Sequence, residues 1–134
     1  MTAWFRFAVL VATAAVVTGC GRSKPAREMQ PVTGSVTLDG KPLQEGEIYF
    51  KKTAAGEVDI LPVVAGQFQG EVGVGTRRVE IYAYHEKEVV PMPGEPPEKT
   101  RENYIPARYN VQSELTAEVA ADDSSPLKFE VTSR

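Results

Sequence analysis

Apolar and polar residues alternate with a period of two along most of the chain after Pro31. Such alternation is typical of β-strands that have one buried and one solvent-facing side. Strands are predicted where apolar residues recur at every second position: Val32, Val36 and Leu38; Ile48 and Phe50; Val79, Ile81 and Ala83; Leu115, Ala117 and Val119; Leu127, Phe129 and Val131. No apolar period of 3.6 residues persists after residue 20, so the pattern favours an all-β fold.

Turn signals separate these strands. Asp39-Gly40 and Ala65-Gly66 suit tight turns, because glycine accepts positive φ and aspartate bonds its own backbone. The β-branched composition of residues 57–64 predicts a further strand, in which Pro62 favours an edge position or a bulge. Gly34 falls on a buried side, where another strand can approach closely. Six or seven short strands of this kind predict a single antiparallel, seven-stranded β-sandwich over residues 31–134.

One segment breaks the alternation. Residues 85–100 hold four prolines and four glutamates without a regular pattern. Prolines are excluded from helix interiors and from central strands, so we expect a long loop here. Loops of this length are uncommon and are usually functional or disordered.

The first twenty residues have a different pattern. Arg6 precedes an apolar run over residues 7–17, and small residues lead to Cys20. This layout is typical of a secretory signal peptide. The run is shorter than the roughly 20 residues that a membrane-spanning helix needs. We therefore expect a signal peptide at residues 1–19 and a flexible polar tether at residues 20–30.

The end of this segment resembles the lipobox of bacterial lipoproteins: Val17-Thr18-Gly19-Cys20. The resemblance implies that Cys20 becomes the first mature residue, carries a diacylglyceryl group on its thiol and is N-acylated, with palmitate as a typical chain. The membrane is then a partner through the lipid on Cys20, and the chain is localised to the bacterial cell envelope. In enteric bacteria an aspartate after the cysteine favours the inner membrane, so Gly21 favours the outer membrane.

The composition of the chain limits the classes of ligand that it is expected to bind. The chain has 15 Lys and Arg against 18 Asp and Glu, and removal of Arg6 with the signal leaves a net charge of about −4. A mildly acidic chain without a basic stripe is not expected to bind nucleic acid. Cys20 is the only cysteine and His85 the only histidine, so we expect no metal site and no cofactor.

The domain itself resembles carboxypeptidase regulatory-like domains, which have the Ig/transthyretin-like sandwich fold. The resemblance rests on residues 31–43 (PVTGSVTLDGKPL), 46–50 (GEIYF), 66–68 (GQF) and 75–81 (GTRRVEI). Residues 104–110 (YIPARYN) and 113–119 (SELTAEV) resemble small planctomycete-type lipoproteins that carry this domain. These signatures imply a fold, and the family supplies no catalytic residues.

Three functions are compatible with the sequence. A lipid-anchored, non-catalytic module serving protein contact or envelope structure is the main prediction. The alternative is carbohydrate binding through Tyr49, Tyr82 and Tyr84, which alternation places on outward faces where rings can stack on sugars. A third hypothesis, an envelope hydrolase, requires Glu86 and Glu88 to gather with His85 in a cleft.

Overall fold

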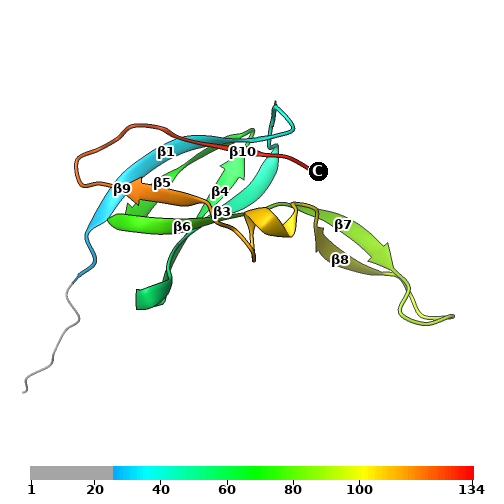
Figure 1. Ribbon diagram of the computed structural model, residues 1–134. Helices are drawn as coiled ribbons and strands as arrows, with labels where there is room; N and C mark the ends of the chain where they lie inside the picture. The colour runs from blue at the N-terminus through cyan, green and yellow to red at the C-terminus, as the bar shows by residue number, and fades with distance from the viewer. Residues whose placement is uncertain (1–25) are drawn as a thin grey trace, which may run out of the picture.

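The computed structural model describes residues 26–134, so Cys20, the signal peptide and most of the tether lie outside the described residues. Residues 26–134 form ten strands and two short 3₁₀ turns (Figure 1). The strands are β1 (Met29–Leu38), β2 (Lys41–Pro42), β3 (Glu45–Lys52), β4 (Glu57–Val64), β5 (Gln67–Gly73), β6 (Gly75–Tyr82), β7 (Tyr84–Val89), β8 (Glu98–Asn103), β9 (Thr116–Val119) and β10 (Leu127–Val131); the turns are η1 (Thr53–Ala55) and η2 (Ala107–Tyr109). β1 begins two residues before the domain boundary expected from the sequence.

Seven strands form a curled sheet in the order β10-β1-β5-β4-β3-β6-β9, and β2 pairs with β1. β4 and β5 pair only at Val64 and Gln67, next to their connecting turn. The sheet therefore folds over at this corner, and its two halves face each other as a sandwich. Phe50 on one half and Phe68 on the other lie with their ring centroids 6.0 Å apart.

The predicted all-β sandwich is confirmed, with two corrections. There are ten strands in place of the expected seven, because β2, β7 and β8 add to the seven of the sandwich path. One neighbouring pair is not antiparallel: β1 and β10 run parallel, from Gly34 opposite Leu127 to Leu38 opposite Val131. The C-terminal strand returns beside β1 by a crossover from β9, and this fixes its direction.

The core contains the predicted inward positions. The side chains of Val36, Ile48, Phe50, Val79 and Ile81 are fully buried. Gly34 is confirmed as a point of close approach. A Cβ there would lie 2.3 Å from both the Leu127 carbonyl oxygen and the Phe68 ring. Burial of these apolar side chains is the main stabilising contribution, worth about 1.5–3 kcal/mol for each large one.

The loop predicted for residues 85–100 is wrong. β7 and β8 pair over six positions, from Tyr84 opposite Asn103 to Val89 opposite Glu98, and form a two-stranded hairpin outside the main sheet. Proline is absent from both strands and confined to the tip between them. At the tip Pro93 is followed by Gly94 with φ of 98°, and the Glu95 amide donates to the Met92 carbonyl at 3.1 Å. This is the pattern of a type II turn.

Figure 1 shows that this hairpin, which we call the arm (residues 84–103), projects from the sandwich at the end away from the N-terminal segment. Over residues 26–134 there is no helix with the length and apolar character needed to span a bilayer.

Candidate functional site

The three tyrosines singled out from the sequence lie together on the outer face of the sandwich. Tyr49 on β3 and Tyr82 on β6 meet edge to face, with ring centroids 4.9 Å apart. Tyr82 and Tyr84 are parallel at 6.3 Å. The pairing of β3 with β6, and the direct passage of β6 into β7, bring the three rings side by side.

Carboxylates hold the phenol groups of this tyrosine cluster. The Tyr49 hydroxyl donates to Glu47 at 2.9 Å and the Tyr82 hydroxyl to Glu80 at 2.8 Å. Burial, assisted by these hydrogen bonds to carboxylates, raises the pKa of Tyr49 and Tyr82 to about 12 each. Both phenols therefore stay neutral donors at physiological pH.

The ring faces are also partly covered. The Arg101 guanidinium lies 4.4 Å from the centre of the Tyr84 ring, and the Lys51 ammonium lies 5.6 Å from that of Tyr49. The same ammonium donates to Glu80 at 2.7 Å. Glu80 is thereby buried in the middle of an outward-facing network. An aromatic face already occupied by a cation or by another ring is less accessible to a sugar.

The residues of the hydrolase hypothesis do not form one cluster. His85 stacks on Tyr104 with ring centroids 5.6 Å apart, and its Nε2 lies 3.4 Å from a Glu102 oxygen. Glu86 pairs with Lys99 at 3.1 Å. Successive residues of a strand point to opposite faces, so His85 and its neighbour Glu86 lie on different sides of the arm.

The structure contains a buried arginine that was not predicted from the sequence. Arg77 on β6 is only 2 % exposed, and its guanidinium donates to Glu57 at 2.8 Å and to the Gly73 carbonyl at 2.7 Å. Arg27 extends the cluster by donating to Asp59 at 2.6 Å. The hydrogen bond from Arg77 is the main cause that lowers the pKa of Glu57. The alternation along the strand was the available sequence signal for this burial, because it puts residue 77 on the same inward side as Val79 and Ile81.

This cluster has a structural role. It ties the segment that enters β1 to strands β4 and β6, because Arg27 lies two residues before Met29. Guanidinium groups paired with carboxylates and carbonyls leave few donors for a ligand.

The outward side of β4 is apolar, unlike the other strands of the sandwich over residues 26–134. We call Val58, Ile60, Pro62 and Val64 the apolar row; Val58, Ile60 and Val64 are 45, 52 and 63 % exposed. The corresponding outward positions of the neighbouring strand β3 are Glu45, Glu47, Tyr49 and Lys51. The row is therefore an exposed hydrophobic patch on a sheet whose other outward positions are mostly polar.

β4 is also open along one edge. It pairs with β3 along its whole length, but with β5 only at Val64. Pro62 predicted an edge or a bulge; in the strand order β4 lies between β5 and β3, but its ladder with β5 is limited to Val64, so Pro62 faces an unpaired side of the strand. Pro62 lies two residues before Val64, so its backbone nitrogen faces the same side of β4 as that of Val64, away from β3. Pro62 has no partner strand on that side, so the N–H that proline lacks costs no hydrogen bond.

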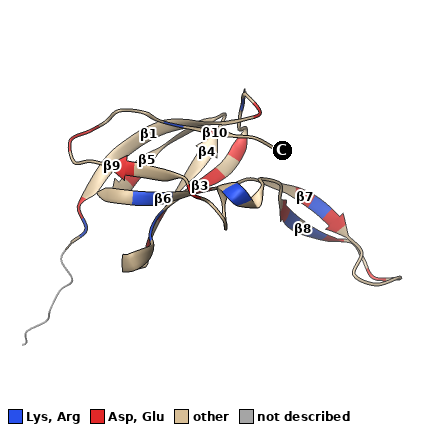
Figure 2. Ribbon diagram, in the orientation of Figure 1, with Lys and Arg blue, Asp and Glu red and all other residues tan. Residues whose placement is uncertain are grey.

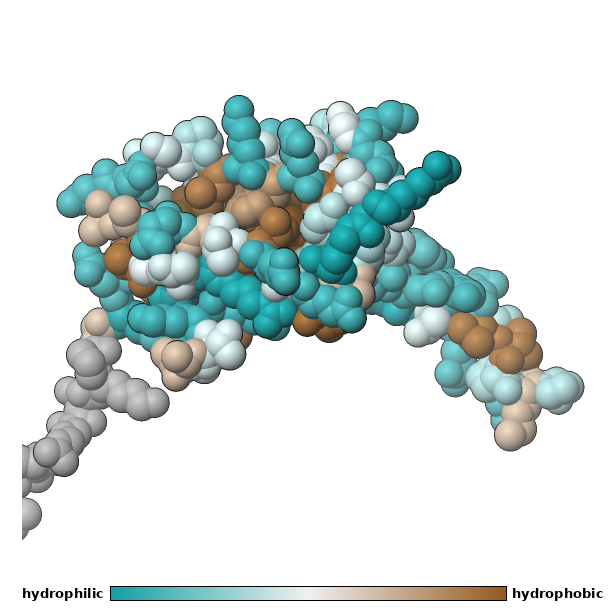
Figure 3. Space-filling model, in the orientation of Figure 1, coloured by the Kyte–Doolittle hydropathy of each residue, from teal (hydrophilic) through white to brown (hydrophobic). Residues whose placement is uncertain are grey.

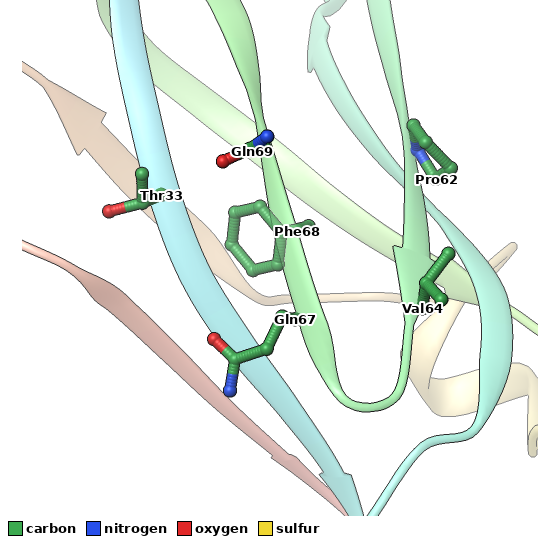
Figure 4. A pocket seen from close by; sticks show the side chains of 6 residues that line it. All are labelled: Thr33, Pro62, Val64, Gln67, Phe68 and Gln69. Atoms are coloured by element: carbon green, nitrogen blue, oxygen red, sulfur yellow. The ribbon is translucent and has the colours of Figure 1, made fainter.

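A hollow of about 540 Å³ lies where β4 and β5 separate (Figure 4). Pro62 and Val64 line it from β4; Gln67, Phe68 and Gln69 line it from β5, and Thr33 from β1. These side chains offer amide and hydroxyl hydrogen bonds beside an apolar wall. None of the six titrates near neutral pH, so the hollow is suited to binding rather than to acid–base chemistry.

Carboxylates, histidine and cysteine do not gather in groups of three or more able to hold a metal ion anywhere in residues 26–134. Asp122 and Asp123 form a turn, in which the Asp123 side chain accepts from the Ser125 amide at 2.9 Å. Cys20, the residue expected to carry the lipid, lies outside the described part of the chain.

Comparisons with known proteins give no match: none among models of protein families, none among curated proteins and none among solved structures. The resemblance to carboxypeptidase regulatory-like domains therefore stays a prediction.

Proposed function

We propose that this protein is a lipid-anchored, non-catalytic module of the bacterial cell envelope that binds another protein chain through its arm. The lipobox-like residues before Cys20 support the anchor, and Gly21 favours the outer membrane. Two or more acyl chains give stable membrane anchoring, since each buried CH₂ contributes about 0.8 kcal/mol.

The arm is the structural feature that best supports the proposal of protein binding. Its strands are exposed on both faces, and its cross-strand ion pairs join Glu86 to Lys99 and Lys87 to Glu102. Figure 2 shows that residues of both charges lie along the arm. Exposed ion pairs contribute little, and an isolated two-stranded hairpin is marginally stable in water. A projecting element of this kind is best explained by a partner that covers it.

The tip strengthens this interpretation. Val89, Val90 and Met92, which we call the apolar tip, are 41, 57 and 64 % exposed. Figure 3 shows them as a hydrophobic patch at the far end of the arm. Three neighbouring prolines and the Pro93-Gly94 turn stiffen the segment, which lowers the entropy lost on binding.

Proximity labelling from the anchored full-length chain tests this function. The expected result is labelled protein that is lost when Val90→Asp and Met92→Asp are introduced and kept with the control Glu130→Gln on the outer side of β10. Equal labelling by the tip variant and the control would overturn the role of the arm.

Carbohydrate binding is the second candidate, favoured by the contiguity of Tyr49, Tyr82 and Tyr84. Tyr84 is the first residue of the arm, and a sugar that stacks on its ring must displace Arg101. Glycan retention that is lost with Tyr84→Ala and raised with Arg101→Ala would support it. No retention by the unaltered protein would dispose of it.

A further inference from the structure

Within residues 26–134, two exposed hydrophobic patches are left uncovered by the fold. The apolar tip is convex and stands at the end of the arm, whereas the apolar row lies along the open edge of β4. We propose that the apolar tip of one molecule packs against the apolar row of a second copy, so that the chain self-associates head to tail. This inference rests on the proposed function, because it names the partner of the arm.

The open edge of β4 favours a strand-like occupant. Natural edge strands are usually protected by lysines, bulges or inward-pointing charges. β4 carries two inward-pointing carboxylates, Glu57 and Asp59, near its Val58 end, where they bind Arg27, Arg77 and the Gly73 amide. From Ile60 to Val64 its only such device is Pro62, and the outward residues of β4 other than Pro62 are β-branched and apolar. The backbone groups of Val58 and Ile60 face the same open edge as those of Val64, by alternation, and can pair with a strand of the arm.

Charged residues beside the two patches indicate which way the arm of one copy runs along β4 of the other. Lys52 is exposed at the Val58 end of the row, and Glu45 lies beside Val64 at the other end. The tip has exposed glutamates at 88, 95 and 98. The ion pairs formed within residues 26–134 involve neither Lys52 nor these three glutamates. The tip is therefore expected at the Val58 end, with β7 antiparallel to β4.

The length of the apolar row and the length of the arm agree with this arrangement. The row spans residues 58–64, about 20 Å at the rise of an extended strand, and the six paired positions of the arm span a similar distance. The two patches differ, so the contact is heterologous and leaves a free tip and a free row at the ends of each assembly. A contact of this size is small beside the 1,200–2,000 Å² typical of stable interfaces, so each contact is weak in solution.

Disulfide cross-linking of the full-length chain tests the contact where it forms. Two differently tagged chains are co-expressed, one with Val90→Cys and the other with Ile60→Cys, and then oxidised. The expected product is a dimer that contains both tags. Replacing Ile60→Cys with Glu130→Cys, on the exposed side of β10, is the control and should give no dimer. Cys20 is present in every sample, so the control also reports any cross-link that it forms.

Charge exchange gives an independent measurement. Lys52→Glu in the chain with Ile60→Cys should lower the yield of the mixed dimer about threefold. Glu95→Lys with Glu98→Lys in the chain with Val90→Cys should restore it. Both sites are exposed, so these substitutions leave the core unchanged.

Four outcomes overturn the inference. They are no mixed dimer, dimers from Val90→Cys alone, dimers from Ile60→Cys alone, and cross-linking of Val90→Cys to a different protein. The last outcome leaves the proposed function standing, since the arm still binds a protein. Failure of the lipid anchor is distinguishable as well, because the anchor is read from the mass of the N-terminal peptide, whereas the contact is read from the mixed dimer.

Discussion

Individual residues set how closely neighbouring strands of the sandwich can pack. Gly34 and Gly70 both lie where a Cβ would come within 2.3 Å of another atom. At Gly34 the nearest atoms are the Leu127 carbonyl oxygen and the Phe68 ring, which are fixed by the sheet and the core. At Gly70 the nearest atom is the end of the Leu61 side chain, which can change rotamer.

We therefore expect Gly34→Ala to lower the free energy of unfolding by about 3 kcal/mol and Gly70→Ala by less than about 1 kcal/mol, because overpacking costs most where neighbours cannot move. Denaturant unfolding of both variants checks this. Equal losses would contradict the assignment of Gly34 as the point of close approach.

Glu57 is a single residue that makes the free energy of unfolding depend on pH. Its pKa is lowered from an ordinary value of about 4.5, mainly by the hydrogen bond from Arg77. A carboxyl whose pKa is lower in the folded state stabilises the fold above its unfolded pKa, and this contribution is lost as the pH falls. Glu57→Gln should make the loss of stability between about pH 5 and about pH 3 less steep.

Urea unfolding across this pH range is the measurement, with Glu71→Gln, an exposed glutamate of β5, as the matched control. The pH dependence of the control should follow the unaltered protein. The assignment fails if both variants change it to the same extent.

At the scale of elements, the strands of the sandwich could be predicted and the arm could not. Alternation located the inward residues of β1, β3, β6, β9 and β10, because one side of each strand faces a common core. The arm has no buried side, so it carries no apolar alternation. Its strands are instead matched by opposite charges across the pair, as with Glu86 opposite Arg101 and Glu88 opposite Lys99. The Pro93-Gly94 dipeptide was the one available signal for its turn.

The candidate site was predictable in part for the same reason. Alternation put Tyr49 and Tyr82 on an outward face, but it could not give their separation, because β3 and β6 are distant in sequence. The apolar row was missed because residues 58, 60 and 64 have the composition of a buried strand. Only the tertiary structure reveals that the inward side of β4 is instead supplied by Glu57, Asp59, Leu61 and Val63.

Trimming the arm tests whether it serves the fold or a partner. Lys87 faces Thr100 across the arm, so replacement of residues 88–99 by Asn-Gly joins them through a two-residue turn. The removed side chains are exposed, and we expect the melting temperature to change by less than about 2 °C. The variant should also lose the cross-linking that depends on the arm.

Thermal unfolding followed by circular dichroism makes the comparison. Ile105→Ala, at a buried position just after the arm, is the matched control and should lower the melting temperature by about 10 °C or more. A similar drop on trimming would assign the arm to the stability of the sandwich.

At the scale of the whole molecule, the described residues place the N-terminal segment at one end of the sandwich and the arm at the other (Figure 1). The N-terminal segment enters β1 beside the Arg27 and Arg77 cluster, and the arm projects from the opposite end (Figure 1). Anchored through Cys20, such a module would hold its arm away from the attachment point and within reach of neighbouring copies.

The lipid on Cys20 is the claim on which this account depends. Mass spectrometry of the N-terminal peptide, taken from protein purified out of the membrane fraction, tests it most directly. The account predicts a peptide that begins at Cys20 and carries the mass of a diacylglyceryl group and an additional acyl chain. A peptide with an unmodified Cys20, or a mature chain that begins elsewhere, would contradict it.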